Sequence, residues 1–205
     1  MIKTVSVGMG PTNAYIYYND RRQGILIDPA DDASHILSEI NKLKIKITAI
    51  IITHGHFDHT KAANEVKKTL DVPIYASKKD ATLANNQDQN GTNYFRFNPI
   101  AVNVDKFLPF DGDIDFDGIV MQVIATPGHT HGSICLYAPN DSVLFSGDTL
   151  FRQSYGRYDL PTGNFETLKI SLEKLFALPD DTEVYPGHGS STTIGYEKIH
   201  NLIKK

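Results

Sequence analysis

Cysteine is nearly absent from this sequence, and long hydrophobic runs are lacking. The single cysteine among 205 residues, Cys135, excludes an internal disulfide and fits a reducing compartment, so we expect a cytoplasmic protein. The opening stretch MIKTVSVGMG has no apolar segment of the kind that a signal peptide carries, so we expect no leader. No apolar stretch approaches the ~20 residues that a membrane-spanning helix needs, and we therefore expect no membrane contact.

An excess of basic residues is lacking as well. The 20 Lys and Arg are outnumbered by 24 Asp and Glu, for a formal net charge of −4. Surfaces that bind nucleic acid are usually basic, so we expect no nucleic-acid partner. The length and the 40% hydrophobic content suit one globular domain, which we place at residues 1–205. The oligomeric state has no signature in the sequence.

Short β-branched runs dominate what is present. Each run has the length of a strand and is bounded by Gly, Pro, Asn or Asp, which favour turns. The runs are IKTVSV, NAYIYY, GILID, ITAIIIT, PIYA, IVMQVIAT, ICLYA, SVLFS and TEVYP.

Helical patterns lie between these strands. Apolar residues at helical spacing predict helices over 36–43 and 165–176, the second one capped by Asn164. Residues 192–203 predict a final helix, and the polar stretch 85–99 predicts a long loop. Strands and helices together predict an α/β domain whose sheets are covered by helices.

Four segments share one pattern: an apolar strand, a turn of small residues or proline, and then a metal-capable side chain. The segments ITAIIITHGHFDH, MQVIATPGH, SVLFSGD and EVYPGH supply His54, His56, Asp58, His59, His129, Asp148 and His188. If the strands run the same way, these side chains gather at one edge of the fold. His54 and His56 are two apart and can point to the same side, whereas the adjacent Asp58 and His59 should diverge. One loop can then serve two metal positions.

The chemistry of these side chains favours a reactive metal site. Imidazole and carboxylate without thiolate suit Zn, Fe or Mn at a reactive site, whereas structural zinc sites usually use cysteine. A bound metal ion lowers the pKa of water to about 7, which makes a hydroxide nucleophile available at neutral pH.

The remaining histidines and two other residues have structural interpretations. We expect His35 to lie in a helix, His200 in the last turns of a helix, and His131 to orient its loop. Cys135 is expected in the core. Asp28 ends the strand ILID, and we expect its carboxylate to hold the imidazole of a metal ligand.

The stretches THGHFDH, TPGHTHGS, SGDTLF and YPGHG resemble, in this order, the metal motifs of the metallo-β-lactamase superfamily. The resemblance implies an αββα sandwich, in which two mixed sheets are flanked by helices. It implies two Zn²⁺ as cofactors, with Fe or Mn possible at one or both positions. The implied ligands are His54, His56 and His129 for one metal, Asp58, His59 and His188 for the other, and Asp148 as the bridge. Asp58 and Asp148 are the implied catalytic carboxylates.

Within the superfamily the chain is most similar to the glyoxalase II group of thioester hydrolases, through the stretch GDTLFRQSYGRYDLPTGN. Two departures limit the similarity. Glyoxalase II carries a C-terminal helical domain that helps to hold glutathione, whereas this sequence ends about 17 residues after His188. The positions of its substrate-contacting tyrosines are occupied here by Asp159 and Ser190. The resemblance therefore implies the metal chemistry, acting on a small-molecule thioester, but not glutathione recognition.

Other functions stay open at the level of sequence. His54, His129 and Asp148 alone would form the two-histidine, one-carboxylate triad of mononuclear iron, as in the related persulfide dioxygenases, although YPGHG is more like the hydrolases. Lactone or phosphodiester hydrolysis would use the same metals. A non-catalytic metal-binding domain is disfavoured, because seven ligands for two ions leave positions open for water.

Substrate recognition is expected from two loops. Arg157 follows a glycine nine residues after the expected bridging aspartate, so its loop should overhang the metals. A guanidinium can bind a carboxylate through two parallel hydrogen bonds, which predicts a thioester with a carboxylate near its sulfur. The alternative is that Arg157 pairs with Asp159 and shapes the loop. Tyr94, with Phe95 and Phe97, is expected to supply an apolar wall.

Overall fold

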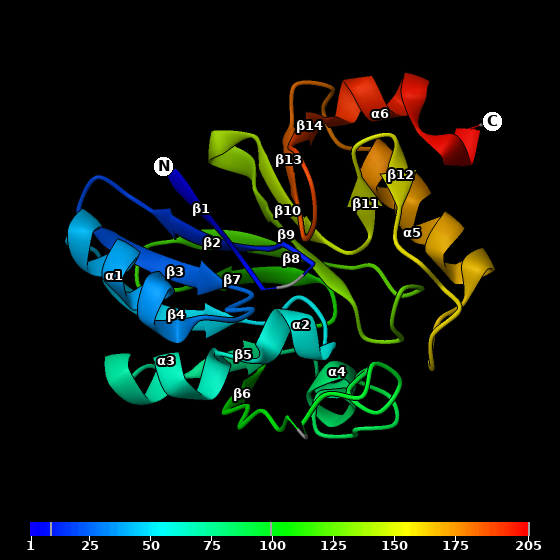
Figure 1. The fold of residues 1–205 in the computed structure, drawn as a ribbon. Coiled ribbons are helices and arrows are strands. Elements are labelled where there is room, and N and C mark those ends of the chain that lie inside the picture. The colour runs from blue at the N-terminus through cyan, green and yellow to red at the C-terminus, as the bar shows by residue number, and fades with distance from the viewer. Residues whose placement is uncertain (9, 99, 205) are drawn as a thin grey trace.

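Two mixed sheets lie face to face, and helices cover both outer surfaces (Figure 1). The computed structural model describes residues 1–8, 10–98 and 100–204. The expected αββα sandwich is confirmed for these residues. The prediction that residues 1–205 form one domain stays a prediction.

The first sheet has six strands in the order β1 to β6. β1, β2 and β3 are antiparallel neighbours, whereas β3 to β6 run parallel. The strands are β1 (Ile2–Val7), β2 (Thr12–Tyr18), β3 (Gln23–Ile27), β4 (Lys46–Ile51), β5 (Ile74–Ala76) and β6 (Lys106–Phe107). Helices α1 (Ala33–Leu43) and α3 (Ala63–Leu70) lie on its outer face, in blue and teal in Figure 1.

The second sheet also has six strands, in the order β14, β13, β10, β9, β8, β7. Only β10 and β13 are parallel neighbours. The strands are β7 (Gly112–Asp115), β8 (Val120–Ala125), β9 (Ile134–Ala138), β10 (Val143–Gly147), β13 (Glu183–Pro186) and β14 (Thr192–Thr193). Helices α5 (Phe165–Phe176) and α6 (Ile194–His200) lie outside it.

The remaining elements are short. They are α2 (Phe57–Thr60), α4 (Lys78–Leu83), the hairpin of β11 (Leu150–Phe151) and β12 (Ser154–Tyr155), and 3₁₀ turns at Pro139–Asp141 and Leu202–Lys204. None of the helices in the described part of the chain is long and apolar enough to cross a membrane.

Alternating side chains of the strands build separate cores on the two faces of each sheet. In β3, Ile25 and Ile27 lie in the core between the sheets, whereas Leu26 packs under the helices of the first sheet. In β9, Leu136 faces the first sheet and Cys135 faces α5. Because both faces of the central strands are buried, strands such as β3 and β9 are apolar almost throughout, whereas the edge strands β6 and β7 carry exposed residues.

Each predicted strand overlaps an observed one, and the helices predicted over 36–43 and 165–176 are α1 and α5. Asn164 caps α5 by accepting a hydrogen bond from the Thr167 amide. The helix predicted over 192–203 is shorter, because Thr192–Thr193 form strand β14 and α6 covers only Ile194–His200. It ends where Asn201 is extended and its buried side chain donates to the carbonyl of Ser154. The stretch 85–99 contains no helix or strand among its described residues, and Pro99 lies outside them.

Candidate metal centre

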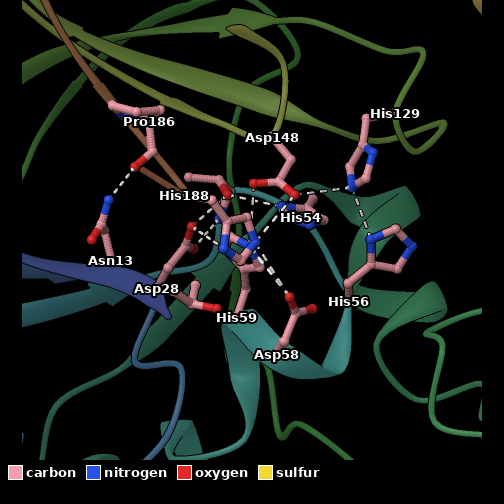
Figure 2. A network of polar contacts seen from close by, with 12 residues as sticks. Asn13, Asp28, His54, His56, Asp58, His59, His129, Asp148, Pro186 and His188 are labelled. Atoms are coloured by element: carbon pink, nitrogen blue, oxygen red, sulfur yellow. Dashed lines mark hydrogen bonds and ion pairs between the residues drawn. The ribbon is translucent and has the colours of Figure 1, made fainter. Parts of the chain in front are cut away.

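The metal-capable side chains meet where strands of both sheets end (Figure 2). His54 follows β4, His129 follows β8, Asp148 follows β10 and His188 follows β13. Asp58 and His59 lie in α2, which begins directly after His56. The strand–turn–ligand pattern therefore brings all these residues to one edge of the fold, as expected.

His54, His56 and His129, here called the inner group, are deeply buried. Their exposed fractions are 1%, 4% and 2%, and their ring nitrogens lie within 4.8 Å of one another. His56 Nδ1 is 2.9 Å from His129 Nε2. Burial lowers the pKa of His56 to about 3 and that of His54 well below the usual histidine value, so both rings are neutral at physiological pH.

Asp58, His59 and His188 are here called the outer group; Asp58 and His188 are partly exposed to solvent, whereas His59 is buried. His188 Nε2 is 3.4 Å from Asp58 Oδ2 and 3.3 Å from His59 Nε2. The expectation that Asp58 and His59 diverge is wrong. It assumed extended backbone, whereas these residues form a helical turn that brings His59 Nε2 to 4.0 Å from Asp58 Oδ2.

Asp148 contacts both groups. One carboxylate oxygen lies 3.3 Å from His59 Nε2, and the other lies 3.6 Å from His129 Nε2 and 3.5 Å from His188 Nε2. Burial by itself would raise the pKa of Asp148, but the surrounding histidines, His59 first, hold it well below the usual range. A Cβ atom at Gly187 would lie 2.2 Å from Asp148 Oδ1, so only glycine leaves this carboxylate its place.

The orientation of the imidazoles fits bound metal ions. Metal-ligating histidines usually donate their second ring N–H to an oxygen. Here Nδ1 of His59, His129 and His188 donates to Asp28, to the Arg157 carbonyl and to the Pro11 carbonyl, at 2.9, 2.7 and 3.0 Å. This arrangement leaves Nε2 of each ring directed at the centre.

Buried polar atoms without hydrogen-bond partners also indicate bound metal ions. His54 Nε2, His56 Nε2 and Asp148 Oδ1 are buried and have no hydrogen-bond partner in the protein. Buried polar atoms without partners are costly, and a divalent cation would satisfy them. The donor set of imidazoles and carboxylates therefore fits divalent metal ions.

Asp28 lies behind the ligands. It receives hydrogen bonds from the Thr53 amide at 2.7 Å, the Thr53 hydroxyl at 2.6 Å and His59 Nδ1 at 2.9 Å. Asp28, His54 and His59 also have ligand atoms close enough to hold an ion. Because both Asp28 oxygens already accept protein hydrogen bonds, its geometry suits the expected role of holding the His59 imidazole.

Asp80 was missed by the sequence analysis. This carboxylate is 1% exposed, and its Oδ2 accepts hydrogen bonds from the Gly55 amide at 2.8 Å and from the Thr130 hydroxyl at 2.6 Å. Gly55 lies between two ligands of the inner group, and Thr130 follows the third. Asp80 therefore ties together the two loops that carry this group. Its setting in KKDATL is typical of an exposed helix start and carries no local signal of burial.

Arg157 contributes its backbone and its side chain in different ways. Its carbonyl oxygen orients His129, which the sequence analysis did not foresee. The guanidinium forms two hydrogen bonds with Asp159, at 2.8 and 2.9 Å, so the pairing considered as the alternative is present. The guanidinium also lies 6.0 Å from the centre of the Tyr94 ring.

A pocket of about 400 Å³, here called the centre pocket, opens over the metal-capable residues. Asp58, His129, Asp148 and His188 line it, and Arg157 lies in its wall. Tyr94 is not among the lining residues and stands at the rim, 65% exposed, whereas its neighbour Phe95 lines the pocket.

The other residues singled out in the sequence lie outside the two groups. His35 lies on the exposed face of α1, and His200 is the exposed last residue of α6. The His131 amide donates to the Thr162 hydroxyl, which fits the expected role in shaping its loop. Cys135 is fully buried, and burial raises the pKa of its thiol to about 11.

Known proteins share this fold and these motifs. Residues 7–188 match the Metallo-beta-lactamase superfamily. The chain is 34% identical to hydroxyacylglutathione hydrolase GloC of Haemophilus influenzae, over 98% of this chain and 96% of GloC. Two solved structures, each aligned over 98% of both chains, are similar: BLEG-1 B3 metallo-beta-lactamase, at 36% identity and TM-score 0.95, and TTHA1623 in a di-iron-bound form, at 35% and 0.88. With its fold, its motifs and these relatives in agreement, the chain belongs to the metallo-β-lactamase superfamily.

Proposed function

We propose that this protein is a binuclear metal-dependent hydrolase of thioesters. The observation that carries the proposal is the convergence of the inner and outer groups around Asp148, beneath a pocket. The hydrolase relatives support metal-dependent hydrolysis, and the likeness to hydroxyacylglutathione hydrolase GloC supports a thioester as the substrate.

The chain's own residues prepare the site for this reaction. Two bound divalent cations would supply a hydroxide nucleophile at neutral pH and polarise the substrate carbonyl. Asp28 and the Arg157 carbonyl fix the rings of His59 and His129, so that Nε2 of each is directed inward. A thiol has a pKa of about 8.5 and leaves readily as thiolate, so a dedicated general acid is not needed.

We propose zinc at both positions, with iron or manganese able to replace it. Imidazole and carboxylate ligands accept all three metals. The likeness to TTHA1623, which was solved in a di-iron-bound form, supports the inclusion of iron.

The substrate is proposed to be a small-molecule thioester in the cytoplasm, bound through Arg157 and Tyr94 at the wall and rim of the centre pocket. A carboxylate near the sulfur would compete with Asp159 for the guanidinium. Replacing Arg157 with alanine should then raise KM for anionic thioesters and hardly change it for neutral ones. Equal changes for both would show that Arg157 only shapes its loop.

The proposal is tested by metal analysis of protein purified without added metal, followed by hydrolysis assays. We expect close to two metal ions per chain and turnover of S-lactoylglutathione with a high KM. A β-lactam, a lactone and a phosphodiester serve as comparison substrates. Turnover of one of these with none of the thioester would overturn the thioester assignment and keep the metal centre.

A variant of the outer group distinguishes the mononuclear-iron dioxygenase from the proposed hydrolase. His188→Ala should leave one metal bound and remove most hydrolysis. If this variant with one iron kept full activity, or if the protein consumed oxygen with a persulfide, the dioxygenase alternative would replace the hydrolase.

A further inference from the structure

A second pocket, here called the side pocket, lies directly beside the metal centre. Its volume is about 480 Å³, within the range of about 300–1,000 Å³ that small-molecule sites have. Phe57, Asp58, Phe95 and His188 line both this pocket and the centre pocket. The two pockets therefore form one groove that passes over the outer group.

The two arms of this groove differ in chemistry. The centre pocket adds the polar side chains of Arg157, Asn90, Ser154 and Tyr155 to the apolar ones of Phe151 and Leu160. In the side pocket, Phe97 packs against the shared Phe57, with ring centres 4.8 Å apart, and extends the aromatic wall of Phe57 and Phe95, whose ring centres lie 5.8 Å apart. Apart from Lys61 and Asp31, the other residues that line only this pocket are Gly8, Gly10, Thr12 and Ala30, and none of these is charged.

The charges in the side pocket are already matched. Apart from Asp58 and His188 of the outer group, its charged lining residues are Lys61 and Asp31, whose charged atoms lie 2.6 Å from each other. An unpaired polar group placed in this arm would find few new partners, whereas an apolar group gains from burial against the rings.

A thioester also has two different arms. Hydrolysis breaks its C–S bond, forms a C–O bond from water, and releases a carboxylic acid from one side and a thiol from the other. With the carbonyl over the metal centre, the acyl chain and the thiol moiety extend in opposite directions along the groove.

We propose that the side pocket binds the acyl chain and that this enzyme prefers thioesters of apolar acyl groups longer than lactoyl. The inference rests on the proposed thioester hydrolysis. The polar arm with Arg157 then receives the thiol moiety, and the aromatic arm sets the acyl specificity.

The experiment measures one series of N-acetylcysteamine thioesters: acetyl, butanoyl, hexanoyl and octanoyl. Because burying a methylene contributes about 0.8 kcal/mol, kcat/KM should rise by roughly three- to fourfold per methylene until the pocket is filled. Calorimetry supplies a second readout, since the product hexanoate should bind the zinc-loaded protein more tightly than acetate.

Gly10 allows the pocket to be filled by mutation. Gly10 lines the side pocket, a Cβ atom there would meet no other atom within 4 Å, and its φ does not lie in the left-handed region. In Gly10→Leu, the hexanoyl-to-acetyl ratio of kcat/KM should fall by at least tenfold. Lys169→Leu, which adds a leucine to the exposed face of α5 at a position that lines neither pocket, should keep the wild-type ratio.

The outcomes separate this inference from the proposed function. If no thioester of the series is hydrolysed, thioester hydrolysis itself is wrong. If all are hydrolysed with equal kcat/KM, or if Gly10→Leu keeps the wild-type dependence on chain length, the acyl assignment alone is wrong. Equal affinity for hexanoate and acetate would also overturn it.

Discussion

The inner and outer groups of the metal centre are held by the fold in different ways. The inner group is made of three imidazoles that are at most 4% exposed, and Asp80 ties its two loops together. In the outer group only His59 is buried, whereas the side chains of Asp58 and His188 are 37% and 31% exposed. The inner group is thus a rigid site prepared in advance, and the outer group is the part that faces solvent and both pockets.

If the protein binds two metal ions, as proposed, this difference predicts that the two positions are unequal. A preorganised, buried set of ligands loses little freedom on binding, whereas exposed ligands must be ordered. We expect the inner position to bind its metal more tightly and the outer position to exchange it more readily.

The largest expected effect comes from removing the residue that joins the groups. Asp148→Ala should lose both proposed metals and reduce turnover by roughly 10³-fold or more, because the Asp148 carboxylate is the only contact shared by His129, His59 and His188 among the described ligands. Elemental analysis and thioester hydrolysis test this. Retention of two metals in the variant would show that Asp148 does not bridge.

A smaller effect, confined to the inner group, separates two nearby histidines. His129→Ala should lower the metal content per chain and should reduce turnover by about 100-fold, since the His129 ring faces His56 and Asp148. His131→Ala should cost only a few-fold, because His131 belongs to neither group. Parallel assays of both variants provide the control, and equal losses would contradict the assignment of His129 as a ligand.

Asp80 tests whether the rigidity of the inner group matters. Asp80→Ala removes the acceptor shared by Gly55 and Thr130 and should weaken metal binding at the inner position by about 10- to 100-fold. Asp80→Asn keeps a carbonyl acceptor and should lose less.

Competition with a chelator measures these affinities, and thermal unfolding of the metal-free variants shows whether the fold is intact. If Asp80→Ala binds both metals as tightly as the wild type, the two loops do not depend on this carboxylate.

A further expected effect, which depends on solution conditions and not on mutation, is a difference in pH dependence. Burial lowers the pKa of His54 and His56, so a metal ion at the inner position meets these two ligands unprotonated. For His59 and His188, burial acts in the same direction, but Asp148 and Asp58 outweigh it and raise both pKa values. A metal ion at the outer position must therefore displace protons as the pH falls through these raised pKa values.

Between pH 8 and 6, affinity at the outer position should fall by up to about tenfold per pH unit for each protonated ligand, and affinity at the inner position should change much less. Titrations with zinc at several pH values measure both. A steeper loss at the inner position would reverse the comparison.

The contacts that the sequence reveals are those with a local signal. The apolar strands end in small-residue turns followed by ligands, so the gathering of His54, His129 and His188 at one edge could be predicted. The roles of Asp80 and of the Arg157 carbonyl could not be predicted, because each contacts a residue at least 25 positions away in the sequence. Neither segment differs from an ordinary exposed helix start or turn. The prediction that Asp58 and His59 diverge failed because of local structure and not distant contacts. It assumed extended backbone, whereas the two residues are helical.

The division of the groove into two pockets could not be predicted from the sequence either. Phe57 follows a ligand of the inner group, while Phe95 and Phe97 come from the long loop, and their stacking depends on tertiary structure. The sequence indicated an apolar wall but not that it continues past the metal centre.

The hydrogen bond from His129 to the Arg157 carbonyl has a consequence for natural variation. Any residue at position 157 supplies a backbone carbonyl, so replacing the side chain there leaves the hydrogen-bond acceptor of His129 unchanged. The constraint falls on Gly156 instead, where a Cβ atom would lie 1.8 Å from the Asp148 carbonyl oxygen and push the loop away. Among homologous sequences, we expect the residue at position 157 to vary with the charge of the substrate and the glycine at position 156 to be conserved.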